Sequence, residues 1–244
     1  ANTGPAAGTI TLDVTGVNDA PVLDNTATPV LSSVAEDTGA PSGAVGTLVS
    51  SLVNLNPPPG GGLDNVTDPD TGATTGIALT ATAGSGTWFY SINGGTSWIA
   101  VGAVSNTSAL LLSANANTRL YFQPSADFNG TVTDAITFRA WDGTSGTAGG
   151  AKVSTATNGG STAFSTATDT ADITVTAVND APVNNLPAQA AGTEDISRAI
   201  TGLSIADVDA GAGSVSVTLG INNGILNVTG AGITITGSGT NSVV

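Results

Sequence analysis

Pairs of aspartates two positions apart are the first residues of this sequence that could do chemistry. Asp68 and Asp70 form one pair, and Asp207 and Asp209 form another. Carboxylates with this spacing in a loop or at a strand end can point at one centre, and calcium takes about six to eight oxygen ligands. Without a cation, massed carboxylates repel one another. The spacing therefore favours bound calcium.

The acidic residues are concentrated rather than scattered. Of the 18, eleven lie in motifs that occur twice or beside Trp141. They are Asp19, Glu36, Asp37, Asp68, Asp70, Asp142, Asp180, Glu194, Asp195, Asp207 and Asp209. A second interpretation stays open, because Asp and Asn are frequent in turns, where their side chains accept hydrogen bonds from backbone amides.

The charge balance restricts the partners. Four Lys and Arg residues against 18 acidic ones give a net charge of −14. This argues against nucleic acid and anionic lipid as partners, since both are bound through clustered basic residues. There is no His and no Cys, so zinc and disulfides are not expected, and hard oxygen ligands suit Ca²⁺. No apolar run is long enough for membrane insertion.

A repeated motif sets the organisation. Val-Asn-Asp-Ala-Pro-Val occurs at 17–22 and again at 178–183. Each copy follows an alternating run, at 10–17 and at 172–178, which predicts a half-buried strand. Proline cannot continue a strand ladder, so each strand closes a module and the motif is the linker to the next module.

These boundaries predict the domains. Residues 1–17 are the last strand of a preceding module, residues 18–179 are a complete module, and residues 180–244 are the first part of a following module. In the complete module, residues 39–62 and 143–170 are interpreted as insertions, and the Pro-Pro-Pro-Gly-Gly-Gly run within the first reads as an exposed loop.

Short strands with turn signals between them predict an all-β fold of tandem Greek-key β-sandwich modules, one complete and one truncated. A hairpin turn is expected at 93–95, where Asn-Gly-Gly accepts positive φ, and one helical turn at 108–115. The strands are expected at 77–83, 87–92, 98–101, 119–123, 135–140, 215–219, 224–228 and 232–236.

The order of these motifs resembles the calcium-binding scheme of cadherin repeats. Residues 121–143 (YFQPSADFNGTVTDAITFRAWDG) are similar to the module end of bacterial cadherin-like and immunoglobulin-like tandem repeats. Such repeats build giant surface adhesins, often exported by type I secretion. The resemblance covers nearly the whole chain, and it implies calcium at the linkers, with neighbouring modules of the same chain as the partners.

Carried over by position, the resemblance implies two groups of metal ligands. The first group is Asn18, Asp19, Asp68, Asp70 and Asp142. The second group is Glu36, Asn179, Asp180, Asp207 and Asp209. The family's paired acidic residues from the middle of the module have no clear counterpart, although Asp127 or Asp134 could substitute.

We therefore expect a structural extender of a large extracellular or cell-surface adhesin, in which calcium stiffens each linker. No enzyme is expected, because there is no His to act as the base for a nucleophile. Two alternatives remain open. One is a module that binds carbohydrate or protein through Trp88, Tyr90, Trp98 and Trp141, and the other is a subunit of a surface filament or layer.

Overall fold

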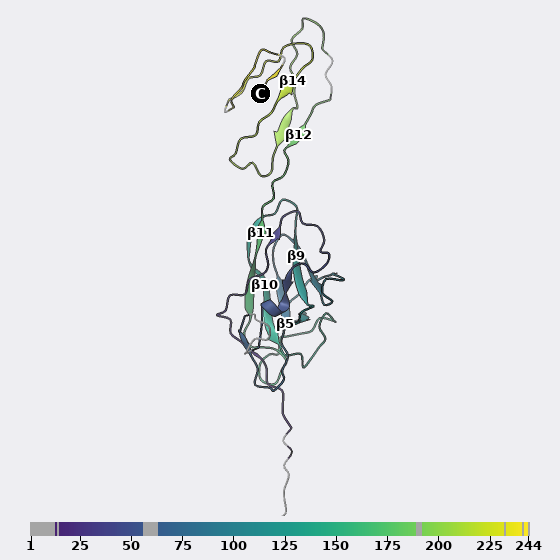
Figure 1. The fold of residues 1–244 in the computed structure, drawn as a ribbon, viewed down its shortest axis with the longest axis vertical. Coiled ribbons are helices and arrows are strands. Elements are labelled where there is room, and N and C mark those ends of the chain that lie inside the picture. Colours follow the sequence, from purple (N-terminus) through teal and green to yellow (C-terminus); the bar gives the residue numbers. More distant parts are fainter. Residues whose placement is uncertain are drawn as a thin grey trace, which may run out of the picture. The chain divides into compact units, whose positions relative to one another are not determined.

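The computed structural model describes residue 13 and residues 15–55, 63–188, 192–231, 233–240 and 242–243. The chain divides into two compact units, Ala1–Val178 and Asn179–Val244, which we call the first unit and the second unit (Figure 1). Half of the predicted strand at 10–17, and the whole proline-glycine run at 57–62, lie outside the described residues, and the described residues 13 and 15–17 are not strand.

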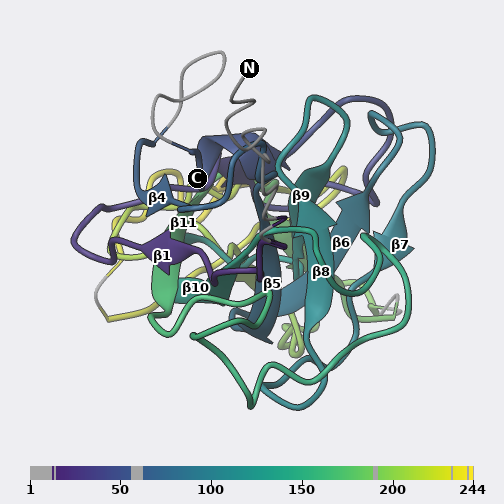
Figure 2. The same ribbon diagram turned by 90° about the horizontal axis from the view of Figure 1, so that it is seen from below.

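The first unit is an all-β sandwich, as the strand pattern predicted. One sheet has the order β2-β11-β10-β5-β8, the other has the order β3-β9-β6-β7, and β1 pairs with β4 separately (Figure 2). The strands are β1 (Val22–Leu23), β2 (Val34–Ala35), β3 (Thr47–Leu48), β4 (Val66–Thr67), β5 (Gly76–Thr82), β6 (Gly86–Ser91), β7 (Ile99–Ala100), β8 (Leu110–Ser113), β9 (Arg119–Pro124), β10 (Gly130–Trp141) and β11 (Asp169–Thr176).

The core lies between these two sheets. Ile77 and Phe138 of the five-stranded sheet join Trp88 and Phe122 of the four-stranded sheet in one buried cluster. The rings of Trp88 and Phe122 are 4.9 Å apart. Alternation along each strand turns one row of side chains inward, and burial of that apolar area is the main stabilising term.

The predicted helical turn at 108–115 is wrong. Residues 110–113 form β8, which pairs antiparallel with β5. Leu110 and Leu112 belong to the main core, whereas Leu111 points into a second cluster with Trp141 and Phe164. A strand that is covered on both faces has an uninterrupted apolar sequence instead of an alternating one, and this removed the signal for a strand.

The segment interpreted as the first insertion supplies part of the core. It contains β3 and the 3-10 helix η1 (Val49–Ser51). The side chains of Val49, Leu52 and Val53 are fully buried. The segment is therefore part of the sandwich up to the last residue described before 63.

The second unit has two small sheets. β12 (Val183–Asn185) pairs with β13 (Ser204–Ala206), and β14 (Leu219–Gly220) pairs with β15 (Ser242–Val243). The strands predicted at 215–219, 224–228 and 232–236 are largely wrong. Of the residues in these three ranges, only Leu219 lies in a strand, β14. Leu226 makes an isolated bridge with Thr240, and the described residues 233–236 are not strand.

The two units begin with the same local structure. In the first unit, Val22 pairs with Thr67, directly before Asp68. In the second unit, Val183 pairs with Ala206, directly before Asp207. The residue after each Glu of the repeated Glu-Asp motif also has the same left-handed backbone, with φ of 58° at Asp37 and 60° at Asp195.

Candidate metal centres

The first group of predicted ligands comes together at one end of the first unit. The backbone N–H of Asp19 donates to Oδ2 of Asp70 (2.8 Å), and the N–H of Asp70 donates to Oδ1 of Asp68 (2.9 Å). The β1–β4 pair holds the two segments side by side. The ladder is short because a proline stands directly before β1 and the Asp-Pro-Asp turn directly follows β4.

Asp142 joins this group from the end of β10. Its side chain is only 3% exposed. Oδ1 accepts hydrogen bonds from the backbone N–H and the hydroxyl of Thr144, at 2.8 and 2.6 Å, and Oδ2 accepts one from Nδ2 of Asn18, at 3.0 Å. Nδ2 of Asn18 also donates to the carbonyl of Thr162. Asp142 is thus a buried carboxyl group at the end of β10, and both of its oxygens accept hydrogen bonds.

One oxygen of the group has no partner. Oδ2 of Asp68 is buried and makes no hydrogen bond. Burial raises the pKa of the Asp68 carboxyl, and the charges of Asp142, Asp70 and Asp19 raise it further. An oxygen that has lost water and gained no donor is destabilising, and a bound cation would stabilise it. The side chains of this group offer carboxylate and amide oxygens as ligands, which fit calcium.

Turn capping explains part of this arrangement. Oδ1 of Asp68 and Oδ1 of Asp142 each accept a backbone N–H two residues further on, as Asp side chains do in turns. It does not explain the unpartnered Oδ2 of Asp68, on which the charges of Asp19, Asp70 and Asp142 also act.

The second unit repeats the arrangement. The N–H of Asp180 donates to Oδ2 of Asp209, and the N–H of Asp209 donates to Oδ1 of Asp207 at 3.0 Å. Oδ1 of Asp207 also accepts the N–H of Ala210 at 2.9 Å. Nδ2 of Asn179 donates to the carbonyl of Asp180. Four of the five residues predicted for the second group therefore lie together.

Glu36, the fifth residue of that group, has a structural role in the first unit. Its side chain is 2% exposed. Oε1 accepts the N–H of Val178 at 2.6 Å, and Oε2 accepts Nδ2 of Asn129 at 2.8 Å. Glu36 thus fixes the chain just after β11 to the loop before β10.

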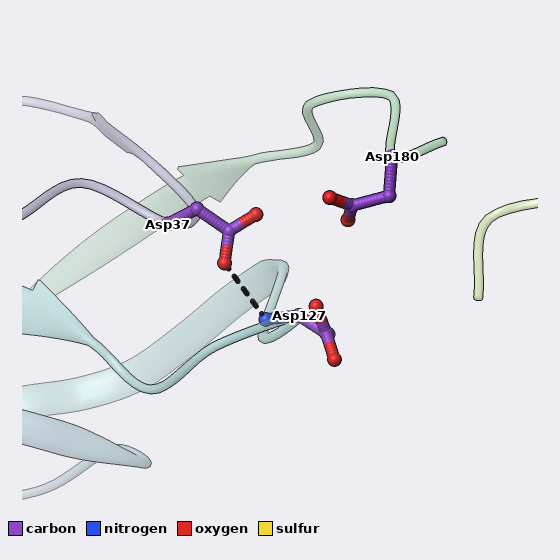
Figure 3. Close-up of side chains that lie close together, drawn as sticks. All are labelled: Asp37, Asp127 and Asp180. Carbon is purple, nitrogen blue, oxygen red and sulfur yellow. Dashed lines mark hydrogen bonds between the residues drawn. The ribbon is translucent and has the colours of Figure 1, made fainter. Parts of the chain in front are cut away.

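Two further carboxylates lie next to Glu36: Asp37, which was not predicted as a ligand, and Asp127, which was named only as a possible substitute. The N–H of Asp127 donates to Oδ1 of Asp37 at 3.1 Å (Figure 3). Both carboxylates lie at the end of the first unit where β2 ends and β10 begins.

A sequence signal existed for Asp37, which follows Glu36 directly and recurs as Asp195. For Asp127 there was less, since it lies 90 residues from Asp37 and meets it only through the fold. Both residues have positive φ, 58° and 57°, a conformation that non-glycine residues seldom adopt.

The aromatic residues considered for a sugar-binding face are mostly in the interior. Trp88, Tyr90 and Trp141 are 4–6% exposed. Trp98 is half-buried, packs edge-on against Tyr121, and donates from Nε1 to the carbonyl of Gly43. These residues therefore pack within the first unit and do not form an exposed aromatic platform.

Comparison of the chain with protein-family models, with curated proteins and with solved structures found no match. Within the described residues, no helix has the length and apolar character that a bilayer crossing requires.

Proposed function

We propose that this chain is part of a tandem array of Greek-key β-sandwich modules in a large extracellular or cell-surface protein, and that it acts as a structural extender. Calcium, bound by carboxylates at the module ends, stiffens the linkers. The single observation that carries the proposal is the repeated bonding of Asp19, Asp68 and Asp70 in Asp180, Asp207 and Asp209.

The first end supports the calcium part of the proposal through its charge. The charges of Asp19, Asp70 and Asp142 act on Asp68 there, and Oδ2 of Asp68 is buried without a donor. When bound, calcium supplies positive charge to these oxygens. Asn18 holds Asp142 in place, and the Asp70 carboxylate holds the backbone of the linker residue Asp19.

The second end supports it through the linker. Glu36 accepts the N–H of Val178, so the chain is held to the sandwich at the residue before the repeated Asn-Asp-Ala-Pro linker. Asp37 and Asp127 lie at the same end of the first unit, where the N–H of Asp127 donates to Oδ1 of Asp37. A short acidic linker without an ion extends because its charges repel, but nothing fixes its direction, and an ion that bridges two segments would restrict it.

A structural role is also favoured over catalysis. The sequence contains no His and no Cys, and the only lysine, Lys152, uses its Nζ to donate to the carbonyls of Val101 and Ala103. The carboxylates lie at repeated positions of the two units. That placement favours a repeated structural site.

Thermal unfolding of residues 1–244 in CaCl₂, in MgCl₂ and in chelator tests the proposal. A ligand at 100 times its Kd stabilises the folded state by about 2.7 kcal/mol, and about 2–4 °C is gained per kcal/mol at this size. We expect a rise of about 5–10 °C with calcium and little with magnesium, which requires stricter octahedral geometry. Equal midpoints in all three solutions would contradict the calcium-stiffened extender.

A further inference from the structure

Asp169 occupies a core position at the start of β11. Side chains along this strand alternate between buried and outward positions. Ala171, Ile173 and Val175 take the buried positions and are 1–3% exposed. Asp169 is in the same row and is 8% exposed. Since the period of a strand is two, a carboxylate here is directed to the side of the strand where apolar residues normally lie.

The carboxylate of Asp169 is only half satisfied. Oδ1 accepts the backbone N–H of the next residue, Thr170, at 2.8 Å. Oδ2 is buried and has no hydrogen-bond partner. Burial raises the pKa of Asp169, and the charge of Asp24 raises it further. A buried charged oxygen without a donor is costly, so this position requires a partner that no side chain of the described residues supplies.

Asp24 is the charged group that acts on Asp169. It follows β1, and its N–H donates to the carbonyl of Asn65 at 2.8 Å. Further along the chain, Val30 bridges in parallel to Asp172 of β11, so the segment that begins at Asp24 reaches the strand that begins at Asp169. Oδ1 of Asp24 accepts the N–H and hydroxyl of Thr26, which lower the Asp24 pKa and keep it ionised.

We propose that Asp24 and Asp169 form a separate cation site in the first unit and that it takes a hard divalent ion such as Ca²⁺. The buried Oδ2 of Asp169 is the inner ligand. Asp24 is exposed, so it gives the ion a path from solvent and leaves room for water ligands. This site is independent of the module-end carboxylates, since neither residue belongs to the repeated motifs.

A two-dimensional amide NMR titration of residues 1–244 with CaCl₂ tests the site directly. The N–H of Thr170 is bonded to Oδ1 of Asp169, and the N–H of Thr26 is bonded to Asp24. Both resonances should shift in a saturable way below about 10 mM calcium, since extracellular calcium modules bind at roughly 10⁻⁴–10⁻³ M. The shifts should be lost in Asp169→Asn and weakened at least about fivefold in Asp24→Asn, and retained in Asp64→Asn, a control at an exposed carboxylate.

Thermal unfolding separates a cation from a proton at Asp169. In chelator, Asp169→Asn should raise the midpoint by about 2–4 °C, the shift expected in a unit of this size when one desolvated charge is removed. In calcium, this gain should disappear because the wild-type protein then has its ion. The same gain in both solutions, with no movement of the Thr170 resonance, would show that Asp169 is simply protonated and would overturn the proposal. If Asp169→Asn does not fold, Asp24→Asn decides the test by itself, because Asp24 is exposed.

Discussion

The backbone N–H of Asp19 donates a hydrogen bond of 2.8 Å to Oδ2 of Asp70, across 51 positions of the chain. Asp180 makes the same bond to Asp209 in the second unit. In both units the acceptor aspartate donates its own N–H to the aspartate two positions earlier. The linker residue is thus tied to an acidic turn in the same way twice, which makes the turn the natural place to test calcium binding.

Asp70→Asn should reduce the stabilisation by calcium. The amide keeps one oxygen to accept the Asp19 N–H, but it removes one negative charge from the group. We expect the midpoint of unfolding of the first unit in chelator to stay within about 2 °C of wild type, while the increase with CaCl₂ falls by half or more. Differential scanning calorimetry measures both values.

The matched control is Asp64→Asn, because Asp64 is an exposed carboxylate four positions before Asp68 and outside the repeated motifs. It removes the same charge and should leave the calcium response intact. Equal responses of Asp70→Asn and Asp64→Asn would mean that the effect of calcium is general screening.

The stability of the calcium-free protein should depend on pH through Asp68. Its pKa is raised in the folded state, first by burial and then by the neighbouring carboxylates. A raised pKa means that the folded state holds the proton more tightly than the unfolded state, so Asp68 favours folding at low pH. That contribution is lost as the pH rises from the ordinary carboxyl pKa through the raised one.

Urea unfolding in chelator, from about pH 3.5 to 7, measures this dependence. Asp68→Asn does not titrate, so the variant should gain stability relative to wild type as the pH rises through this window. A difference between the two proteins that stays constant with pH would show that Asp68 keeps an ordinary pKa. Calcium should reduce the difference at neutral pH, since it would balance the charge that the variant removes.

Glu36→Ala should destabilise the first unit strongly. The substitution removes a buried carboxylate that accepts the N–H of Val178 and Nδ2 of Asn129 and leaves both donors without an acceptor. Hydrogen bonds to charged groups contribute about 1.5–3 kcal/mol each. We expect a loss of about 3 kcal/mol in the free energy of unfolding, measured by urea denaturation.

The repeat supplies the control for this variant. Glu194 occupies the corresponding Glu-Asp motif in the second unit and is exposed, so Glu194→Ala should change stability by less than about 0.5 kcal/mol. Comparable losses in the two variants would contradict the role given to Glu36. Glu36→Gln should be intermediate, because its amide oxygen can still accept the Val178 N–H.

The sequence predicted those elements whose signal is local. β5, β6 and β9 alternate or carry β-formers over six or seven residues, and Asn-Gly-Gly marks the turn after β6. β8 was missed because both of its faces are covered. β1–β4 and β12–β13 were missed because two or three residues are too short to show a period, although these pairs place the acidic turns.

The residues of the candidate metal centres divide in the same way, into those with a local sequence signal and those without one. Asp68 and Asp70, or Asp207 and Asp209, are neighbours in sequence, and the repeat linked each pair to its linker aspartate. Asp127 and Asp169 gave no such signal. Asp127 reaches Asp37 only when β10 and β2 are in place. Asp169 is an acidic residue in the buried row of a strand, where a period-two pattern expects an apolar one.

Gly95→Ala tests the turn that the sequence did predict. Gly95 has φ of +90°, and a Cβ there would lie 1.9 Å from the carbonyl oxygen of Gly43. Backbone atoms cannot move aside cheaply, so we expect the free energy of unfolding to fall by about 3 kcal/mol or more, from strain plus displacement.

Gly94→Ala is the matched control. It also has positive φ, +70°, but its nearest contact is Oδ1 of Asn117 at 3.5 Å, so only the left-handed penalty of about 1–2 kcal/mol applies. Urea unfolding of both variants separates the two costs. Similar losses at Gly94 and Gly95 would show that the loop at residue 43 does not pack against this turn.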